Sequence, residues 1–142
     1  MKNLILIALT ILSFNGYSQI VVKETPKDTI IWQQSKLIIL PKLVRFSFDN
    51  EFSYVIYYKN AKYSSITDIN YITTGDLETT KQFFELCKSV IVEDKEFSID
   101  MDKKSISLQK SLGAAMVYMS NSYFYLTEKQ IDLILEKLKL EI

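Results

Sequence analysis

The sequence predicts a single α+β domain in which two helices pack on an antiparallel β-sheet of about 6–8 strands. Apolar and polar residues alternate in several short segments, a pattern typical of half-buried strands. Two other segments, residues 77–92 and 128–140, carry apolar residues at helical spacing. Short turns make successive strands antiparallel, and each one-sided helix needs a sheet face to cover.

A cleaved signal peptide is predicted for residues 1–18. Lys2 precedes an apolar run over residues 4–12, and Gly16 and Ser18 supply the small side chains expected before a cleavage site. The alternative is a membrane anchor, but the run is shorter than the roughly 20 residues that span a bilayer. We therefore expect an exported protein, periplasmic or secreted, without membrane insertion of the mature chain.

Residues 19–27 are predicted to form an extended N-terminal arm, and residues 28–142 to form the domain. Removing 18 of the 142 residues leaves 124, which is enough for one core without disulfides. The chain contains 17 Lys plus Arg and 17 Asp plus Glu, scattered along its length. This balance provides no field to attract nucleic acid, so we expect no nucleic-acid partner.

The strands are predicted to fall into two groups, one before each helix. Pro41 interrupts the β-prone run over 37–48, because proline cannot donate to a sheet ladder. Residues 97–109 give the clearest pattern, a hairpin with one apolar and one polar face. The other predicted strands are 29–32, 52–58, 63–72, 114–119 and 123–126.

Both helices have recognisable N-terminal signals. Asp76 is the predicted N-cap of the first helix, and Thr127 and Gln130 have the spacing of a capping box at the start of the second. In the second helix, apolar residues form a stripe opposite a charged face. These features fix the helix starts more firmly than their ends.

The composition excludes several classes of active site. The chain has no histidine, so it lacks the commonest general base and metal ligand and cannot form a Ser-His-Asp triad. Cys87 is the single cysteine, and it falls on the apolar stripe of the first helix. Burial in the core is the preferred interpretation. A mixed-disulfide dimer is the alternative.

No cofactor or metal site is predicted. The three glycines, Gly16, Gly75 and Gly113, lack the neighbours of a phosphate-binding loop. Asp100 and Asp102 lie two apart on one strand face, but no calcium-loop framework surrounds them. A solvated hairpin end is the interpretation that fits them.

Tyrosine is the one unusual enrichment, with nine in the chain. Tyr54, Tyr57 and Tyr58 are the candidate binding residues, since tyrosine combines a large apolar ring with a polar tip. The alternative is that aromatic residues simply favour strands. Tyr57 is the most interesting candidate, because Ser53 and Val55 are its neighbours on the more polar face of the strand.

The leading hypothesis is a non-enzymatic exported binding or protein-interaction domain. It would recognise an unknown protein or a cell-envelope component through a sheet face or an edge strand. The second hypothesis is a histidine-free enzyme that uses carboxylate, tyrosine or lysine chemistry, for example a pair of carboxylates, which would need two buried acids facing one cleft. The third is a structural envelope subunit that forms a homodimer through an apolar sheet face.

Overall fold

The structure, a computed structural model, describes residues 27–34, 41–63 and 68–141. The predicted signal peptide over 1–18, the arm up to residue 26 and the β-prone residues 37–40 lie outside the described residues. Export and signal cleavage therefore stay predictions from the sequence.

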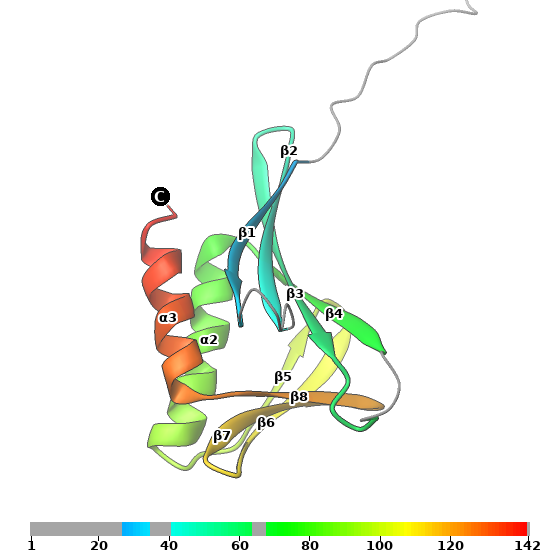
Figure 1. Cartoon of the computed structure of the whole chain (residues 1–142), viewed down its shortest axis with the longest axis vertical. Helices are drawn as coiled ribbons and strands as arrows, with labels where there is room; N and C mark the ends of the chain where they lie inside the picture. Colours follow the sequence, from blue (N-terminus) through cyan, green and yellow to red (C-terminus); the bar gives the residue numbers. More distant parts are fainter. Residues whose placement is uncertain (1–26, 35–40, 64–67, 142) are drawn as a thin grey trace, which may run out of the picture.

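The described residues form one α+β fold with eight strands and two helices (Figure 1). Both predicted helices are confirmed, and the second ends one residue earlier than predicted. Of the strand predicted over 63–72, the structure describes a strand only from Ile69, and this strand continues beyond the predicted end to Gly75. In chain order the elements are β1 (Lys27–Gln33), β2 (Lys42–Phe48), β3 (Glu51–Lys59), β4 (Ile69–Gly75), α2 (Leu77–Val92), β5 (Phe97–Met101), β6 (Lys104–Ser111), β7 (Ala114–Met119), β8 (Ser122–Leu126) and α3 (Glu128–Lys139).

The strands divide into two four-stranded sheets rather than one continuous sheet. The first has the order β1-β2-β3-β4 and the second the order β5-β6-β7-β8, and every neighbouring pair is antiparallel. Each sheet is thus a simple meander followed by one helix. The two sheets follow one another in the chain, and α2, rather than a short turn, joins β4 of the first to β5 of the second.

Three of the hairpin turns have two central residues with positive φ. This conformation matches the right-handed twist of the flanking strands, which is why two-residue hairpins favour it. One of these turns joins β5 to β6. Lys103 lies at the tip of this turn and has a φ of 58°. The paired turn residues are Asp49 and Asn50, Asp102 and Lys103, and Leu112 and Gly113.

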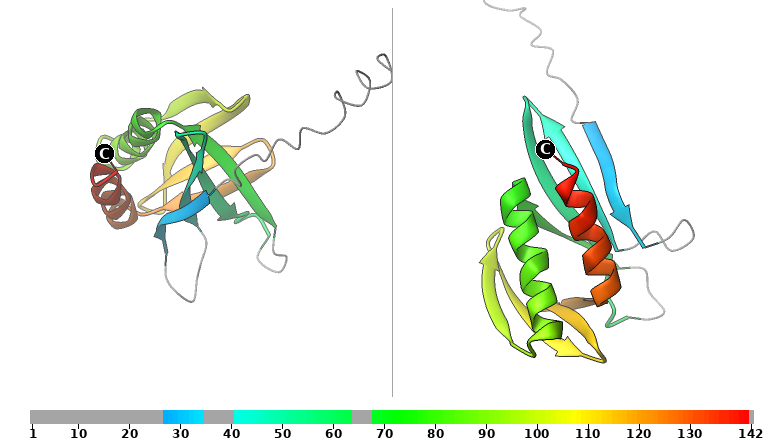
Figure 2. Two further views of the ribbon diagram at one scale, coloured as in Figure 1. Left: turned by 90° about the horizontal axis from the view of Figure 1, so that it is seen from above. Right: turned by 90° about the vertical axis from the view of Figure 1, so that its left-hand side faces the viewer.

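The two helices lie side by side along one side of the molecule (Figures 1 and 2). Asp76 caps α2 by accepting from the backbone N–H of Thr79, and the predicted capping box of Thr127 and Gln130 is present on α3. The apolar face of α2 contacts β3 and β4 of the first sheet as well as β6 and β7 of the second, while α3 packs on α2 and β1. One core therefore joins both sheets and both helices.

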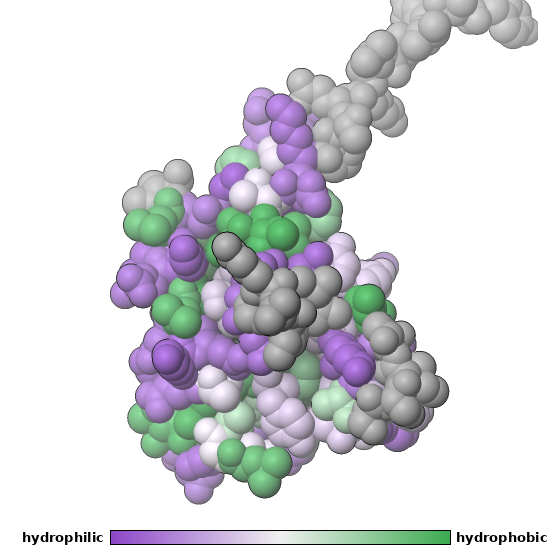
Figure 3. Space-filling model, in the orientation of Figure 1, coloured by the Kyte–Doolittle hydropathy of each residue, from purple (hydrophilic) through white to green (hydrophobic). Residues whose placement is uncertain are grey.

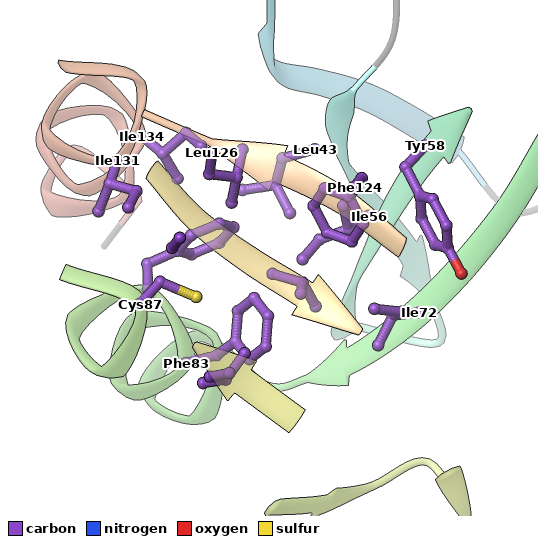
Figure 4. Close-up of a cluster of buried hydrophobic side chains, with 14 of the residues drawn as sticks. Leu43, Ile56, Tyr58, Ile72, Phe83, Cys87, Phe124, Leu126, Ile131 and Ile134 are labelled. Atoms are coloured by element: carbon purple, nitrogen blue, oxygen red, sulfur yellow. The ribbon is translucent and has the colours of Figure 1, made fainter. Parts of the chain in front are cut away.

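Cys87 lies in this core, as predicted, with 0 % of its surface exposed (Figure 4). Burial raises the pKa of the Cys87 thiol, which keeps it protonated and unreactive. We expect no labelling of the native protein by iodoacetamide and full labelling after unfolding. A Leu133→Cys variant, which places a thiol on the exposed side of α3, should label at once. Rapid labelling of native Cys87 would contradict the buried position and restore the mixed-disulfide alternative.

The view of the surface in Figure 3 is largely hydrophilic, with separate small hydrophobic patches. In the part of the chain that the structure describes, neither helix has the length and apolar character needed to cross a bilayer.

Candidate functional site

A cleft of about 430 Å³ lies where the two sheets meet. Residues from β3 and β4 of the first sheet form one side, and the β5–β6 and β7–β8 turns, with the adjoining ends of β6, β7 and β8, form the other. We call this the junction cleft. It is lined by Tyr58, Asn70, Lys103, Lys104, Ser105, Met119, Ser120, Asn121 and Ser122.

Tyr58 forms part of the floor of the junction cleft. Its ring is buried and stacks on Phe124 with 4.4 Å between the ring centroids. Its hydroxyl lies 2.7 Å from Ser122 Oγ and 3.4 Å from Met119 Sδ. Burial raises the pKa of this hydroxyl, although the bond with Ser122 partly opposes that effect. Figure 4 shows the hydroxyl pointing away from the helices.

Asn60 braces one wall of the cleft, a role that the sequence did not reveal. Its buried side chain donates to the backbone carbonyl of Asn121 over 3.1 Å and to the Asp68 carboxylate over 3.2 Å. Its side-chain oxygen accepts from the backbone N–H of Lys62. The backbone N–H of Ala61 also donates to the Tyr123 carbonyl over 2.8 Å. These bonds hold the end of β3 against the β7–β8 turn.

Two lysines and an amide give the junction cleft its chemical character. Lys103 is exposed at the tip of the hairpin, and Lys104 reaches across to the first sheet, where its Nζ donates to the Tyr71 carbonyl over 2.8 Å. The side-chain nitrogen of Asn70 is buried and has no hydrogen-bond partner among the described residues. The lining therefore combines positive charge with hydrogen-bond donors that the described residues leave unused.

Two neighbouring tyrosine side chains, with a lysine at each end, lead away from the cleft across the outer face of the first sheet. We call Lys42, Tyr57, Tyr71 and Lys104 the Lys–Tyr row. Lys42 Nζ lies 5.4 Å from the centroid of the Tyr57 ring, and Lys104 Nζ lies 4.7 Å from that of Tyr71. The two tyrosine rings are tilted neighbours with 6.2 Å between centroids. Lys104 belongs to both features, so the row and the cleft form one continuous surface.

The structure separates the three tyrosines that the sequence proposed as binding residues. Tyr57 lies half-buried on the outer face, while Tyr54 and Tyr58 alternate with it and lie in the core. Tyr54 does not reach the junction cleft lining. Lys103 and Lys104 fall within the predicted hairpin over 97–109, where no pattern marked them as site residues, and no pattern marked Asn70.

Tyr54 instead belongs to a polar cluster at the end of α3. Its hydroxyl donates to Glu141 Oε2 over 3.2 Å, and the same carboxylate oxygen forms an ion pair with Arg45. Burial, followed by the charge of Glu141, raises the pKa of Tyr54 to about 12. The Arg45 guanidinium also lies over the Phe52 ring, 4.8 Å from its centroid. This cluster attaches the chain beyond α3 to β2 and β3.

A second groove of about 700 Å³ runs between the two helices, but its charges compensate one another. Lys88 Nζ and Asp132 Oδ1, for example, are 2.6 Å apart. Its acids, Glu85, Asp132 and Glu136, are exposed, and no acidic side chain in the described residues is buried. The two-carboxylate enzyme hypothesis required two buried acids facing one cleft, and the described structure provides no such pair. Nor do the described residues gather three or more potential metal-ligating side chains.

No protein-family model, no curated protein and no solved structure matches the chain. The chemistry of the junction cleft is therefore the basis for the proposed function.

Proposed function

We propose that the protein is a non-enzymatic binding domain whose ligand docks in the junction cleft. The observation that carries this proposal is the unused donor capacity of the lining. A lysine ammonium has three donors, and the fold uses one from Lys104 on a backbone carbonyl. The Asn70 nitrogen is buried without a described partner, and leaving such a group unpaired costs about 1–3 kcal/mol. A polar ligand in the cleft would accept from the remaining donors of Lys104.

Binding accounts for the lining better than catalysis does. Among the described residues that line the cleft there is no carboxylate, and the chain contains no histidine. The lining thus supplies donors and positive charge but neither of the usual general bases. In keeping with the predicted export, we propose that the ligand is a component of the cell envelope or its surroundings.

A fragment screen by NMR tests this function without assuming a ligand. The isotopically labelled protein is titrated with small carboxylates, amines, polyols and amides, and backbone amide shifts are followed. We expect the shifts to cluster at Asn70, Lys103 and Ser120, because these residues line one cleft from both sheets.

A cleft-filling variant provides the control. Ser120 is exposed in the β7–β8 turn, so Ser120→Trp should occupy the cleft without disturbing the core and should suppress the shifts. Leu133→Trp adds the same side chain to the exposed side of α3 and should leave them unchanged. Shifts that cluster elsewhere, or that persist in Ser120→Trp, would refute a ligand site in the junction cleft.

A further inference from the structure

We propose that the ligand is an acidic glycan, a polymer of sugar units that carry carboxylates, which docks in the junction cleft and extends along the Lys–Tyr row. This inference rests on the proposed function and names the ligand class for the same site. Three kinds of contact are involved. Lysine ammonium groups pair with the carboxylates of the ligand, serine hydroxyls and asparagine amides pair with its sugar hydroxyls, and tyrosine rings pack on the faces of its sugar rings.

The first contact is between charges. Lys103 and Lys104 both line the cleft, and no carboxylate from the described residues lines it with them. A ligand carboxylate in this cleft would therefore meet two ammonium groups, and such charge-assisted hydrogen bonds are stronger than neutral ones. Lys42 stands at the far end of the Lys–Tyr row, beyond both tyrosines. Lysines thus stand at both ends of the surface, where they can pair with successive acidic groups of one polymer.

The second contact is with hydroxyl groups. Ser105, Ser120 and the amides of Asn70 and Asn121 surround the lysines in the lining. Serine hydroxyls and amides both donate and accept hydrogen bonds, which suits the hydroxyls of a sugar. Met119 and Tyr58 are the main apolar contributors, and the Tyr58 hydroxyl is held by Ser122. The cleft therefore suits a ligand that combines hydroxyl groups with apolar faces, as a sugar does.

The third contact is with aromatic rings. Tyr57 and Tyr71 pair across β3 and β4 on the outer face, and 53 % of Tyr71 is exposed. An exposed ring that does not serve the core is available to cover the apolar face of a sugar. Because Lys104 lies over Tyr71, the rings begin where the cleft ends. A chain of sugars leaving the cleft would meet Tyr71 first and then Tyr57.

Other polyanions fit this surface less well. Nucleic-acid binders neutralise many phosphates with clustered basic residues, whereas this chain balances 17 basic against 17 acidic residues. An acidic peptide would engage the lysines, but it has no hydroxyl-rich rings to pair with the serine and amide groups of the lining. The lining thus favours a glycan among the polyanions.

Calorimetric titration with three polymers tests the ligand class. The protein is titrated with polygalacturonate, with its fully methyl-esterified form, and with polyglutamate. We expect binding to polygalacturonate that weakens as salt rises, because exposed charges are screened. We expect at least about tenfold weaker binding to the esterified polymer, which keeps the sugar but loses the charge, and to polyglutamate, which keeps the charge but loses the sugar.

Matched variants assign the contacts. Lys103→Gln/Lys104→Gln should weaken binding to polygalacturonate by about tenfold or more. The charge-matched control, Lys110→Gln/Lys129→Gln, removes two exposed lysines outside the cleft and should bind as the wild type does. Tyr71→Ala should weaken binding about fivefold, while Tyr71→Phe, which keeps the ring, should not. Thermal unfolding of each variant shows whether the fold is intact.

Three results would overturn the glycan assignment. These are equal affinity for the esterified polymer, equal affinity for polyglutamate, or wild-type affinity in Lys103→Gln/Lys104→Gln. If fragments still cluster in the junction cleft while polygalacturonate fails to bind, the ligand class is wrong and the binding function stands. If the fragments also fail to cluster there, the proposed function is wrong as well.

Discussion

Replacing Phe83 with alanine is expected to lower the free energy of unfolding by about 3–5 kcal/mol. Only 1 % of Phe83 is exposed, and it belongs to the core that joins α2 to both sheets. Its ring also packs edge-on against Phe84 with 5.2 Å between centroids. Since single domains are stable by only about 5–15 kcal/mol, this one change would remove a large share of the stability.

Urea unfolding followed by circular dichroism measures this effect. Gln82→Ala is the matched control, because the neighbouring Gln82 is an exposed residue of α2 and its loss should change the free energy by less than about 0.5 kcal/mol. A loss below about 1.5 kcal/mol for Phe83→Ala would mean that α2 is not the common support of the two sheets.

The free energy of unfolding is also expected to fall at alkaline pH, because Tyr54 loses its proton. The pKa of Tyr54 is raised from 10.0 to about 12 in the folded protein. Between these values the unfolded chain releases the proton while the folded chain keeps it, so unfolding becomes more favourable as pH rises. The stabilisation from the protonated Tyr54 hydroxyl is complete below its pKa of 10.0 in the unfolded chain. It is lost as the pH rises through its pKa of about 12 in the folded protein. The pKa difference corresponds to about 2–3 kcal/mol at the top of this range.

Comparing urea unfolding at pH values from 10 to 12 in the wild type and in Tyr54→Phe isolates this contribution, because phenylalanine has no proton to lose. The wild type should lose about 2 kcal/mol more than Tyr54→Phe over this range. Glu141→Gln should remove only part of the difference, since burial is the larger cause of the raised pKa. Equal alkaline losses in the wild type and Tyr54→Phe would show that the Tyr54 hydroxyl is not buried against Glu141.

Local patterns predicted the elements of this fold better than their arrangement. The helix over 77–92 and the capping box of Thr127 and Gln130 depend on residues a few positions apart, and both are confirmed. The hairpin of β5 and β6 is equally local. The division into two sheets depends instead on whether β4 pairs with β5 across α2. Periodicity carries no information on pairing between strands so far apart in the chain.

The candidate site was harder to predict for the same reason. Alternation along β3 separated Tyr57 from Tyr54 and Tyr58, and the structure places them on opposite faces. Lys104 and the Tyr71 carbonyl, however, are 33 residues apart and meet only because the β5–β6 hairpin folds against the edge of the first sheet. From the sequence alone, a pair of lysines at a hairpin tip is indistinguishable from solvated surface.

The simple meander-and-helix order of each half has a thermodynamic consequence for the cleft. Within the chain, the two sheets are connected only through residues 76–96, which include α2. The junction cleft takes its lining from both sheets, so it exists only when the halves are docked together. A bound ligand would act as a second tether between them. Occupancy would then raise the unfolding free energy of the whole molecule, by an amount that grows with the logarithm of ligand concentration.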